Sequence, residues 1–423
     1  MRKPAHARPE RLLPTTRAQV TGHRFMRRRV EHGLVFGDIR MIHDPLATRR
    51  RAMILGVVAV ALGVAAAALF AWLKPAPNPG DALIWRDAAG NLYVRVDDTV
   101  HPVSNLASAR LVAGTAEEPA RVGQEHLVGA PRGVPIGIGD APSAFAAAET
   151  PDLTWAVCER AGEVTVLAVE AAAAPRAFAP DTAVLASVGG KEWVVTAEGR
   201  TLLPASDSPQ GRVVRRRLGI DAGTPRWQPP AGVLGALREH PPVALPDPLP
   251  EVLTAGEESW LLTADGGVQN VSPTQRDILA DAGASVREVE RDDVAGYPDA
   301  APAVDLRLPE TAPRWADPAA GAVCVDESRG AAGGEGVDAA GRTPLSGGAV
   351  ATHFAGLPAG SVAVDTGHGY HVVSLHGLRH EADSAATLEV LGAAHVETVP
   401  WEILSLLPEG SPLSRAAALT ATY

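Results

Sequence analysis

The longest uninterrupted apolar stretch of the chain lies near its start. Residues Met53 to Leu73 contain no charged side chain, the triplet Arg49-Arg50-Arg51 precedes them, and Lys74 follows. At about 1.5 Å of rise per residue, a helix of this length extends roughly 31 Å, which matches a hydrocarbon core of about 30 Å. The pattern therefore predicts one transmembrane helix from Met53 to Leu73.

A cleaved signal peptide is the alternative interpretation of this stretch. The small residues Ala66-Ala67-Ala68 offer a cleavage site. A secretory signal, however, has an apolar region of roughly 7 to 15 residues behind a short basic segment. Here the apolar run is longer and 52 residues precede it, so the sequence favours a helix that stays attached.

A second pattern recurs four times after the apolar run: short strands that alternate apolar and polar residues, turns that contain glycine, and a short helix. The predicted copies occupy residues 83–144, 183–245, 246–304 and 361–423, the last including the C-terminal tail. An aromatic residue recurs at the centre of the second strand in each copy, where a half-buried pleated surface favours it; these residues are Tyr93, Trp193, Trp260 and Tyr370. In the third copy the pattern is expected to open with the strand Ser259–Thr263 and to continue into a helix from Pro273 to Gly283 with Ser272 as its N-cap.

The segments between the copies, residues 145–182 and 305–360, contain both cysteines together with Trp155, Trp315 and Phe354. We expect them to form a β-rich central core, with a mobile Gly- and Ala-rich loop over residues 326–349. The predicted fold class is α+β: a single transmembrane helix, a linker over residues 74–82, and an elongated outer domain of four quasi-symmetric small α+β repeats around a disulfide-linked core.

Charge is divided unevenly between the two sides of the predicted helix. Residues 1–52 hold thirteen Lys and Arg against four Asp and Glu, a net charge of +9, and the remaining chain is −20. The excess of basic residues places the N-terminal arm in the cytoplasm and the chain from about Pro75 onward outside it. The acidic outer part is not suited to bind nucleic acid.

Cys158 and Cys324 are the only cysteines and both lie in the outer part. That compartment is oxidising, so we expect one Cys158–Cys324 disulfide; two buried free thiols are the alternative. The chain-entropy model gives about 5 kcal/mol as an upper value for the stabilisation from closing so long a loop.

The N-terminal arm has the pattern of an amphipathic helix. Met26, Val30 and Leu34, with Gly33 and Gly37, share one face at helical spacing, and basic side chains crowd the other positions. A break at Asp44-Pro45-Leu46 would separate this arm from the membrane helix. We expect the arm to dock onto a protein partner through Arg24, Met26, Arg27, Arg28, Val30 and Leu34; a helix lying on anionic lipid, at about 1 kcal/mol per basic residue, and a nucleic-acid contact are the alternatives.

Catalytic motifs are weak throughout the chain. Gly189-Gly190-Lys191-Glu192 lacks the first glycine and the hydroxyl residue of a P-loop and is interpreted as a hairpin turn. Asp365-Thr366-Gly367 resembles the triplet of aspartic proteases but occurs once, at another predicted turn. The sequence predicts no catalytic residue and no cofactor.

Four histidines, His368, His371, His376 and His380, lie close together in the sequence. Their spacing along alternating strands does not direct them to one point, and neither cysteine is near. No metal site is predicted from them.

A family resemblance is carried by residues 14–35 of the arm, by Asp38–Met41 and Asp44–Leu46, and outside by Leu92–Val96, His101–Leu111 and Gly137–Pro142. These segments resemble EccB, a core membrane component of the type VII (ESX) secretion machinery of actinobacteria. The resemblance implies four quasi-symmetric repeats, a disulfide-bearing core, and a single-pass plasma-membrane protein with a cytoplasmic N-terminus. It also implies assembly with EccC, the motor ATPase, with EccD and EccE, and with further copies of itself, as a non-catalytic structural subunit.

Two other functions stay open at this stage. Some members of this family are described as ATPases, so a membrane-anchored component that hydrolyses or binds nucleotide, or binds another ligand, is the alternative to a structural subunit. Repeated β-rich units also occur in modules that bind cell-wall glycans.

Overall fold

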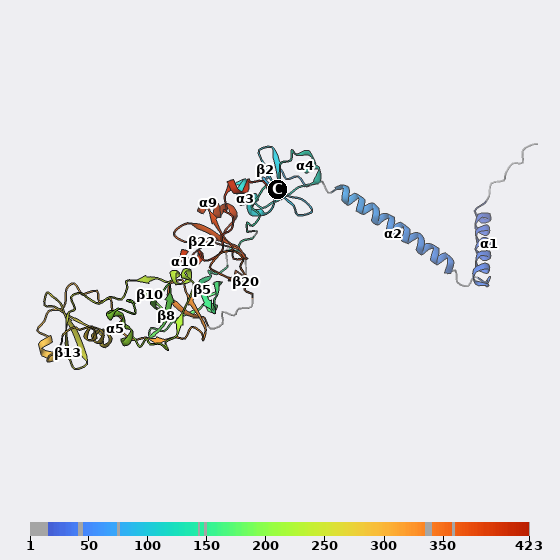
Figure 1. The fold of residues 1–423 in the computed structure, drawn as a ribbon. Coiled ribbons are helices and arrows are strands. Elements are labelled where there is room, and N and C mark those ends of the chain that lie inside the picture. Colours follow the sequence, from blue (N-terminus) through green and yellow to red (C-terminus); the bar gives the residue numbers. More distant parts are fainter. Residues whose placement is uncertain are drawn as a thin grey trace, which may run out of the picture. The chain divides into compact units, whose positions relative to one another are not determined.

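The computed structural model describes residues 16–40, 45–73, 77–142, 144–147, 150–334, 341–357 and 360–422. The chain divides into two compact units, Met1–Ala76 and Pro77–Tyr423. The first unit contains helices α1 (Arg17–Phe36) and α2 (Pro45–Leu73), both labelled in Figure 1. In α1 the Thr16 hydroxyl and the Gln19 side chain cap each other's backbone N–H groups, and Gly37 ends the helix with φ 69°.

Helix α2 includes the whole predicted transmembrane segment. Its stretch from Thr48 to Phe70 is long and apolar enough to cross a membrane. The helix begins earlier than predicted, at Pro45, because proline fits the first position of a helix, where its missing N–H has no partner to lose. Asp44, the first residue of the predicted break, lies outside the described residues.

The outer unit contains four small sheets of one topology. In each, three antiparallel strands are followed by a helix and then by a fourth strand parallel to the first, so the strand order is third, second, first, fourth. A further helical turn follows, and the chain then returns in parallel beside the third strand. We number these units repeats 1 to 4 in chain order; the residue limits predicted above for them stay predictions.

The elements of the repeats have the following bounds. Repeat 1 contains β1 (Ile84–Arg86), β2 (Leu92–Val96), β3 (Thr99–Val103), α3 (Leu106–Ala113), β4 (Ala120–Arg121) and α4 (Gln124–Gly129). Repeat 2 contains β8 (Thr182–Val188), β9 (Lys191–Thr196), β10 (Gly199–Leu202), α5 (Pro209–Arg217), β11 (Arg226–Trp227), α6 (Ala231–Ala236) and β12 (Glu239–His240). Repeat 3 contains β13 (Glu251–Ala255), β14 (Glu258–Leu262), β15 (Val268–Asn270), α7 (Pro273–Asp281), β16 (Val286–Glu288) and α8 (Arg291–Val294). Repeat 4 contains β22 (Val362–Asp365), β23 (Tyr370–Val373), β24 (Arg379–Ala382), α9 (Ala385–Leu391), β25 (Val396–Thr398) and α10 (Trp401–Leu404), and α11 (Arg415–Ala418) follows.

A seven-stranded sheet forms the centre of the outer unit, in the order β20-β21-β6-β5-β18-β19-β7. Its strands are β5 (Thr154–Arg160), β6 (Glu163–Val169), β7 (Arg176–Ala177), β18 (Ala322–Val325), β19 (Ala331–Gly334), β20 (Thr343–Pro344) and β21 (His353–Gly356), with a 3-10 turn at Ala171–Ala173. Cys158 on β5 and Cys324 on β18 face each other in register and form the predicted disulfide, with their Cα atoms 3.9 Å apart. The bond therefore joins two neighbouring strands that are 166 residues apart in sequence.

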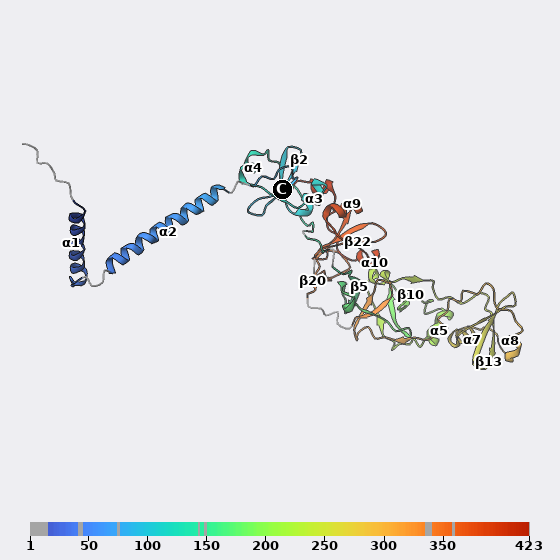
Figure 2. The ribbon, with the colours of Figure 1, turned by 180° about the vertical axis from the view of Figure 1, so that it is seen from behind.

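The buried side chains show which parts pack together. The face of the central sheet that carries Trp155 and Phe354 packs against residues of repeats 2 and 4. Repeat 1 shares a second core with repeat 4, in which α3 contacts α9, and repeat 2 shares a third with repeat 3, in which α5 contacts α7. The helices α3 and α9 lie side by side in both views of the ribbon (Figures 1 and 2). The repeats thus form the pairs 1–4 and 2–3 around the central sheet.

The structure corrects three predictions about the outer unit. Trp260 lies in the second strand of repeat 3, as predicted, but this strand does not open the repeat, because β13 precedes it. Trp315 does not join the central core: β17 (Arg314–Trp315) pairs with β8, and the indole N–H donates to the Leu218 carbonyl at 2.9 Å. The predicted loop over residues 326–349 contains β19 and β20, which extend the central sheet on opposite sides; residues 335–340 lie outside the described residues.

Candidate functional site

Helix α1 exposes the apolar face that the sequence predicted. The exposed fraction is 58% for Met26, 59% for Val30 and 82% for Leu34. Ile39, beyond the helix end, turns back toward Gly33, since a Cβ atom there would lie 3.0 Å from the Ile39 Cγ2 atom. The face is thus covered on one side at Gly33 and open at the three larger side chains.

The basic residues predicted for this helix, Arg24, Arg27 and Arg28, are all exposed on α1. Arg27 Nε contacts Glu31 Oε1 at 3.0 Å, one helical turn away. Such an exposed pair adds only about 0.3 to 0.5 kcal/mol to helix stability. The arrangement provides an apolar surface with a basic border, which is suited to contact another helix or a lipid surface.

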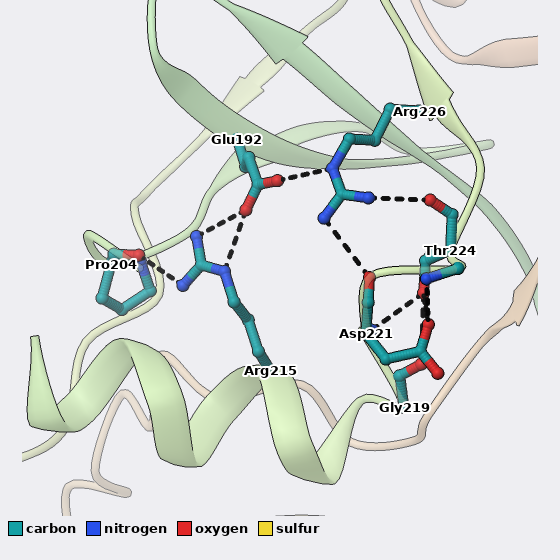
Figure 3. A network of polar contacts seen from close by, with 8 residues as sticks. Glu192, Pro204, Arg215, Gly219, Asp221, Thr224 and Arg226 are labelled. Carbon is teal, nitrogen blue, oxygen red and sulfur yellow. Dashed lines mark hydrogen bonds and ion pairs between the residues drawn. The ribbon is translucent and has the colours of Figure 1, made fainter. Parts of the chain in front are cut away.

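The Gly189-Gly190 segment is a hairpin turn between β8 and β9, with φ of 60° and 76° at the two glycines. Glu192, which follows Lys191, accepts hydrogen bonds from Arg215 Nε at 2.9 Å and Arg226 Nε at 3.1 Å (Figure 3). Partial burial raises the pKa of Glu192, but the hydrogen bonds from the two arginines outweigh it and hold that pKa below its ordinary value. The residue at the hydroxyl position of a P-loop is instead a carboxylate that stabilises repeat 2.

The Asp365-Thr366-Gly367 segment is also a hairpin turn, between β22 and β23. Asp365 Oδ1 accepts the backbone N–H of Gly367 at 2.8 Å, and the Thr366 hydroxyl donates to the Gly369 carbonyl at 3.0 Å. The carboxylate that a protease would use is thus part of a local turn.

Two of the four neighbouring histidines of repeat 4, His371 and His380, are buried and serve packing, whereas His368 and His376 are exposed. His371 stacks on Trp401 with ring centroids 5.3 Å apart, and burial lowers the pKa of this imidazole. His380 lies on the neighbouring strand, fully buried, with Nδ1 at 2.9 Å from the Ser411 carbonyl. A Cβ atom at Gly410 would lie 2.3 Å from the His380 ring, so this close approach requires glycine. Within the described residues no group of three or more His, Cys, Asp or Glu is arranged to hold a metal ion.

Two buried tryptophan–glutamate contacts attach repeats to the central sheet. Trp155 on β5 donates its indole N–H to Glu397 of repeat 4 at 2.9 Å, and Trp227 of repeat 2 donates to Glu159 on β5 at 2.6 Å. Glu397 also accepts the backbone N–H of Leu153 at 3.1 Å. The sequence does not predict these pairs, because no local pattern relates positions that are 242 and 68 residues apart.

Comparison with known proteins gives a consistent result over nearly the whole chain. The family model described as "Type VII secretion system ESX-1, transport TM domain B" matches residues 12–375 and 331–422. The chain is 29% identical to the ESX-1 secretion system ATPase EccB1 of Mycobacterium tuberculosis, over 96% of this chain and 94% of that protein. It is 30% identical to the ESX-3 secretion system ATPase EccB3 of Mycolicibacterium smegmatis, over 96% of this chain and 90% of that protein.

Solved structures agree with this assignment. A chain of an intact ESX-5 inner membrane complex matches with a TM-score of 0.64 and 25% identity, over 98% of this chain and 97% of that chain. The EccB3 dimer of the ESX-3 core complex shares the fold, with a TM-score of 0.66 over 80% of this chain and all of that chain. The chain therefore belongs to the EccB family of type VII secretion systems.

Proposed function

We propose that this chain is a structural subunit of a type VII secretion complex in the inner membrane. Helix α2 anchors it, the arm with α1 lies in the cytoplasm, and the four repeats lie outside. The observation that carries this proposal is that the family match includes the arm, the anchor and all four repeats, from residue 12 to residue 422. The related chain of the ESX-5 inner membrane complex supports it, because it aligns with 98% of this chain.

The outer unit is suited to bear load between parts of an assembly. Every repeat shares a core with another repeat, and a disulfide cross-links two neighbouring strands of the central sheet. The segments that resemble catalytic motifs are hairpin turns whose carboxylates are held by neighbouring groups. The EccB3 dimer supports self-association of this chain as well.

Helix α1 is the proposed docking element for other subunits, the EccC-, EccD- and EccE-like proteins of the complex. Its apolar face, formed by Met26, Val30 and Leu34, is more than half exposed at each of these side chains. Burying a side chain of this size contributes roughly 1.5 to 3 kcal/mol, so a partner that covers the face gains substantial binding free energy.

The test is co-purification of the full chain, tagged at its C-terminus and extracted in mild detergent from its native membrane. We expect the wild type in a large complex with a motor ATPase and a multispanning partner, and M26D/V30D alone. The matched control is V35D. Val35 is 62% exposed and nine residues from Met26, which places it on the opposite face of the helix. Assembly by M26D/V30D as efficient as by V35D would show that α1 does not dock through this face.

Nucleotide hydrolysis is the second candidate function, supported by the naming of the relatives as secretion system ATPases. The relevant measurement is phosphate release from ATP by the full chain purified without other subunits. Release that K191A abolishes would favour the enzymatic role, because Lys191 is the residue at the lysine position of the P-loop-like segment.

A further inference from the structure

Repeat 1 contains a cleft of about 840 Å³ at the ends of β1 and β4. Three arginines line it: Arg86 ends β1, Arg121 ends β4, and Arg132 follows α4. Arg86 and Arg121 are direct partners in the parallel pairing of the two strands. Like charges at paired positions of neighbouring strands destabilise a sheet, so this arrangement calls for an opposite charge.

The described residues form no ion pair that supplies that charge. Arg86, Arg121 and Arg132 are exposed and have no hydrogen-bond or ion-pair partner among the described residues. Asp87 is the one carboxylate in the lining, and its oxygens already accept hydrogen bonds from Ala89 N, Asn91 N, Asn91 Nδ2 and Tyr93 Oη at 2.8 to 3.2 Å. The three arginines that line the cleft therefore have guanidinium donors that make no hydrogen bond or ion pair with a described residue.

Arginines on the fourth strands of repeats 2 and 3, by contrast, have carboxylate partners. The fourth strand of each also carries an arginine, Arg226 on β11 and Arg287 on β16. Arg226 binds Glu192, which Arg215 shares (Figure 3), and Arg287 Nε binds Glu251 Oε1 at 2.9 Å. A cleft of about 610 Å³ in repeat 3 has Arg287 and Arg291 in its lining, and these bind Glu251 and Glu258. The three arginines of the cleft in repeat 1 have no such carboxylate partner among the described residues.

Repeat 1 is also the repeat that follows the membrane anchor directly. Pro77 lines the cleft, and its carbonyl accepts the backbone N–H of Gly123 at 2.8 Å. Only three residues separate Leu73, the end of α2, from Pro77, so the Cα atoms of these two residues lie at most about 14 Å apart. This short connection limits how far Pro77 can lie from the end of the anchor.

We propose that this arginine cleft binds the phosphate group of an anionic phospholipid in the outer leaflet. Guanidinium groups suit this ligand because their planar N–H forks match phosphate oxygens. A bound headgroup would hold repeat 1 at the membrane surface. The inference rests on the membrane anchoring in the proposed function and is independent of docking by α1.

The test uses the full chain in a neutral detergent, titrated with short-chain phosphatidylglycerol. Amide hydrogen exchange is followed in peptides spanning residues 84–90 and 120–132, which separates the cleft from the basic arm. We expect protection of these peptides in the wild type, with half-maximal protection at a roughly thirtyfold higher lipid concentration in R86Q/R121Q. The matched control R287Q/R291Q alters arginines that already have partners, and it should titrate like the wild type.

Comparator ligands and a second variant keep the result decisive. Short-chain phosphatidylcholine and inorganic phosphate at the same concentrations should give little protection. Equal protection by inorganic phosphate would identify free phosphate as the ligand and overturn the lipid assignment, as would equal protection by phosphatidylcholine. If R86Q/R121Q exposes the core amides of β2, R132Q replaces it, with a roughly fivefold shift expected. An unchanged titration in a folded variant would show that the arginines do not bind the lipid.

Discussion

Two glutamates accept buried and partly buried hydrogen bonds where repeat 4 contacts the central sheet. Glu397 is 6% exposed and accepts hydrogen bonds from Trp155 Nε1 and Leu153 N. Burial raises its pKa above the ordinary value of 4.5, and the nearby charge of Asp152 acts in the same direction while His395 opposes it. Glu327 accepts the backbone N–H of Trp155 at 2.7 Å, and its pKa is raised as well, first by burial and also by Glu397. The contact between repeat 4 and the central sheet is therefore sensitive to pH.

We expect E397Q to weaken the pH dependence of stability. Above pH 4.5 the unfolded chain has lost the proton that the folded protein still holds on Glu397. The wild-type free energy of unfolding therefore falls as the pH rises through this window, until the folded carboxyl also ionises. Glutamine does not titrate, so the melting temperature of E397Q relative to wild type should increase between about pH 4 and about pH 7.

The low-pH end of the same experiment serves as its control. There Glu397 of the wild type is protonated and as neutral as the glutamine of E397Q. The difference in melting temperature between the two proteins then reports only the changed hydrogen bonding to Trp155 and Leu153. Melting temperatures of the full chain, measured in one detergent across the range, give both quantities. Parallel curves for the two proteins would contradict the prediction.

Among the helices and strands, the sequence predicted those elements whose ends and apolar spacing are defined by residues close together in the chain. The helix α7 with its Ser272 cap was predicted because its capping box and its apolar spacing lie within a few residues. Helix α5 was not, because it is rich in arginine and only Val214 and Gly211 are buried. It forms because Ser208 caps it, Pro209 starts it, and Arg215 and Arg217 bind carboxylates on β9 and α7.

One disulfide bond cross-links the neighbouring strands β5 and β18 of the central sheet. We expect C158A/C324A to lower the free energy of unfolding by about 2 to 5 kcal/mol, since the loop that the disulfide closes is long. Alanine is used because a serine hydroxyl at these buried positions would add the cost of an unpaired polar group. Thermal melting of the full chain measures the change, and hydrogen exchange should locate it in β5 and β18.

Reduction of the wild type provides the independent comparison. Under reducing conditions its melting transition should approach that of C158A/C324A, and the variant itself should not respond. An unchanged transition of the reduced wild type would mean that the pairing of β5 with β18 is stable without the disulfide.

For the whole molecule, the sequence predicted the four repeats but not which of them share a core. Arg110 of repeat 1 donates to the Leu391 carbonyl of repeat 4 at 2.7 Å, across 281 residues of chain. Arg86, Arg121 and Arg132 meet in one cleft only because parallel pairing joins β1 to β4. The apolar face of α1 was predictable because helical spacing alone defines it. Contacts made by tertiary pairing leave no such local pattern.

The pairing of repeats 1–4 and 2–3 predicts which parts lose stability together. Ile278 of α7 is fully buried in the core of repeats 2 and 3, and Leu391 of α9 in the core of repeats 1 and 4. Truncation of either to alanine should cost about 2 to 5 kcal/mol. Native-state hydrogen exchange should show I278A accelerating amides in repeats 2 and 3, and L391A accelerating those in repeats 1 and 4.

Each of the two variants is the control for the other, because they remove similar side chains from opposite pairs. The L391A result is the more demanding one, since repeat 1 stands at the start of the outer sequence and repeat 4 at its end. Acceleration confined to repeat 4 would mean that repeat 1 is stable without the shared core. Acceleration in all four repeats would mean that the central sheet couples both pairs into one cooperative unit, so that a loss of packing in one pair destabilises the other.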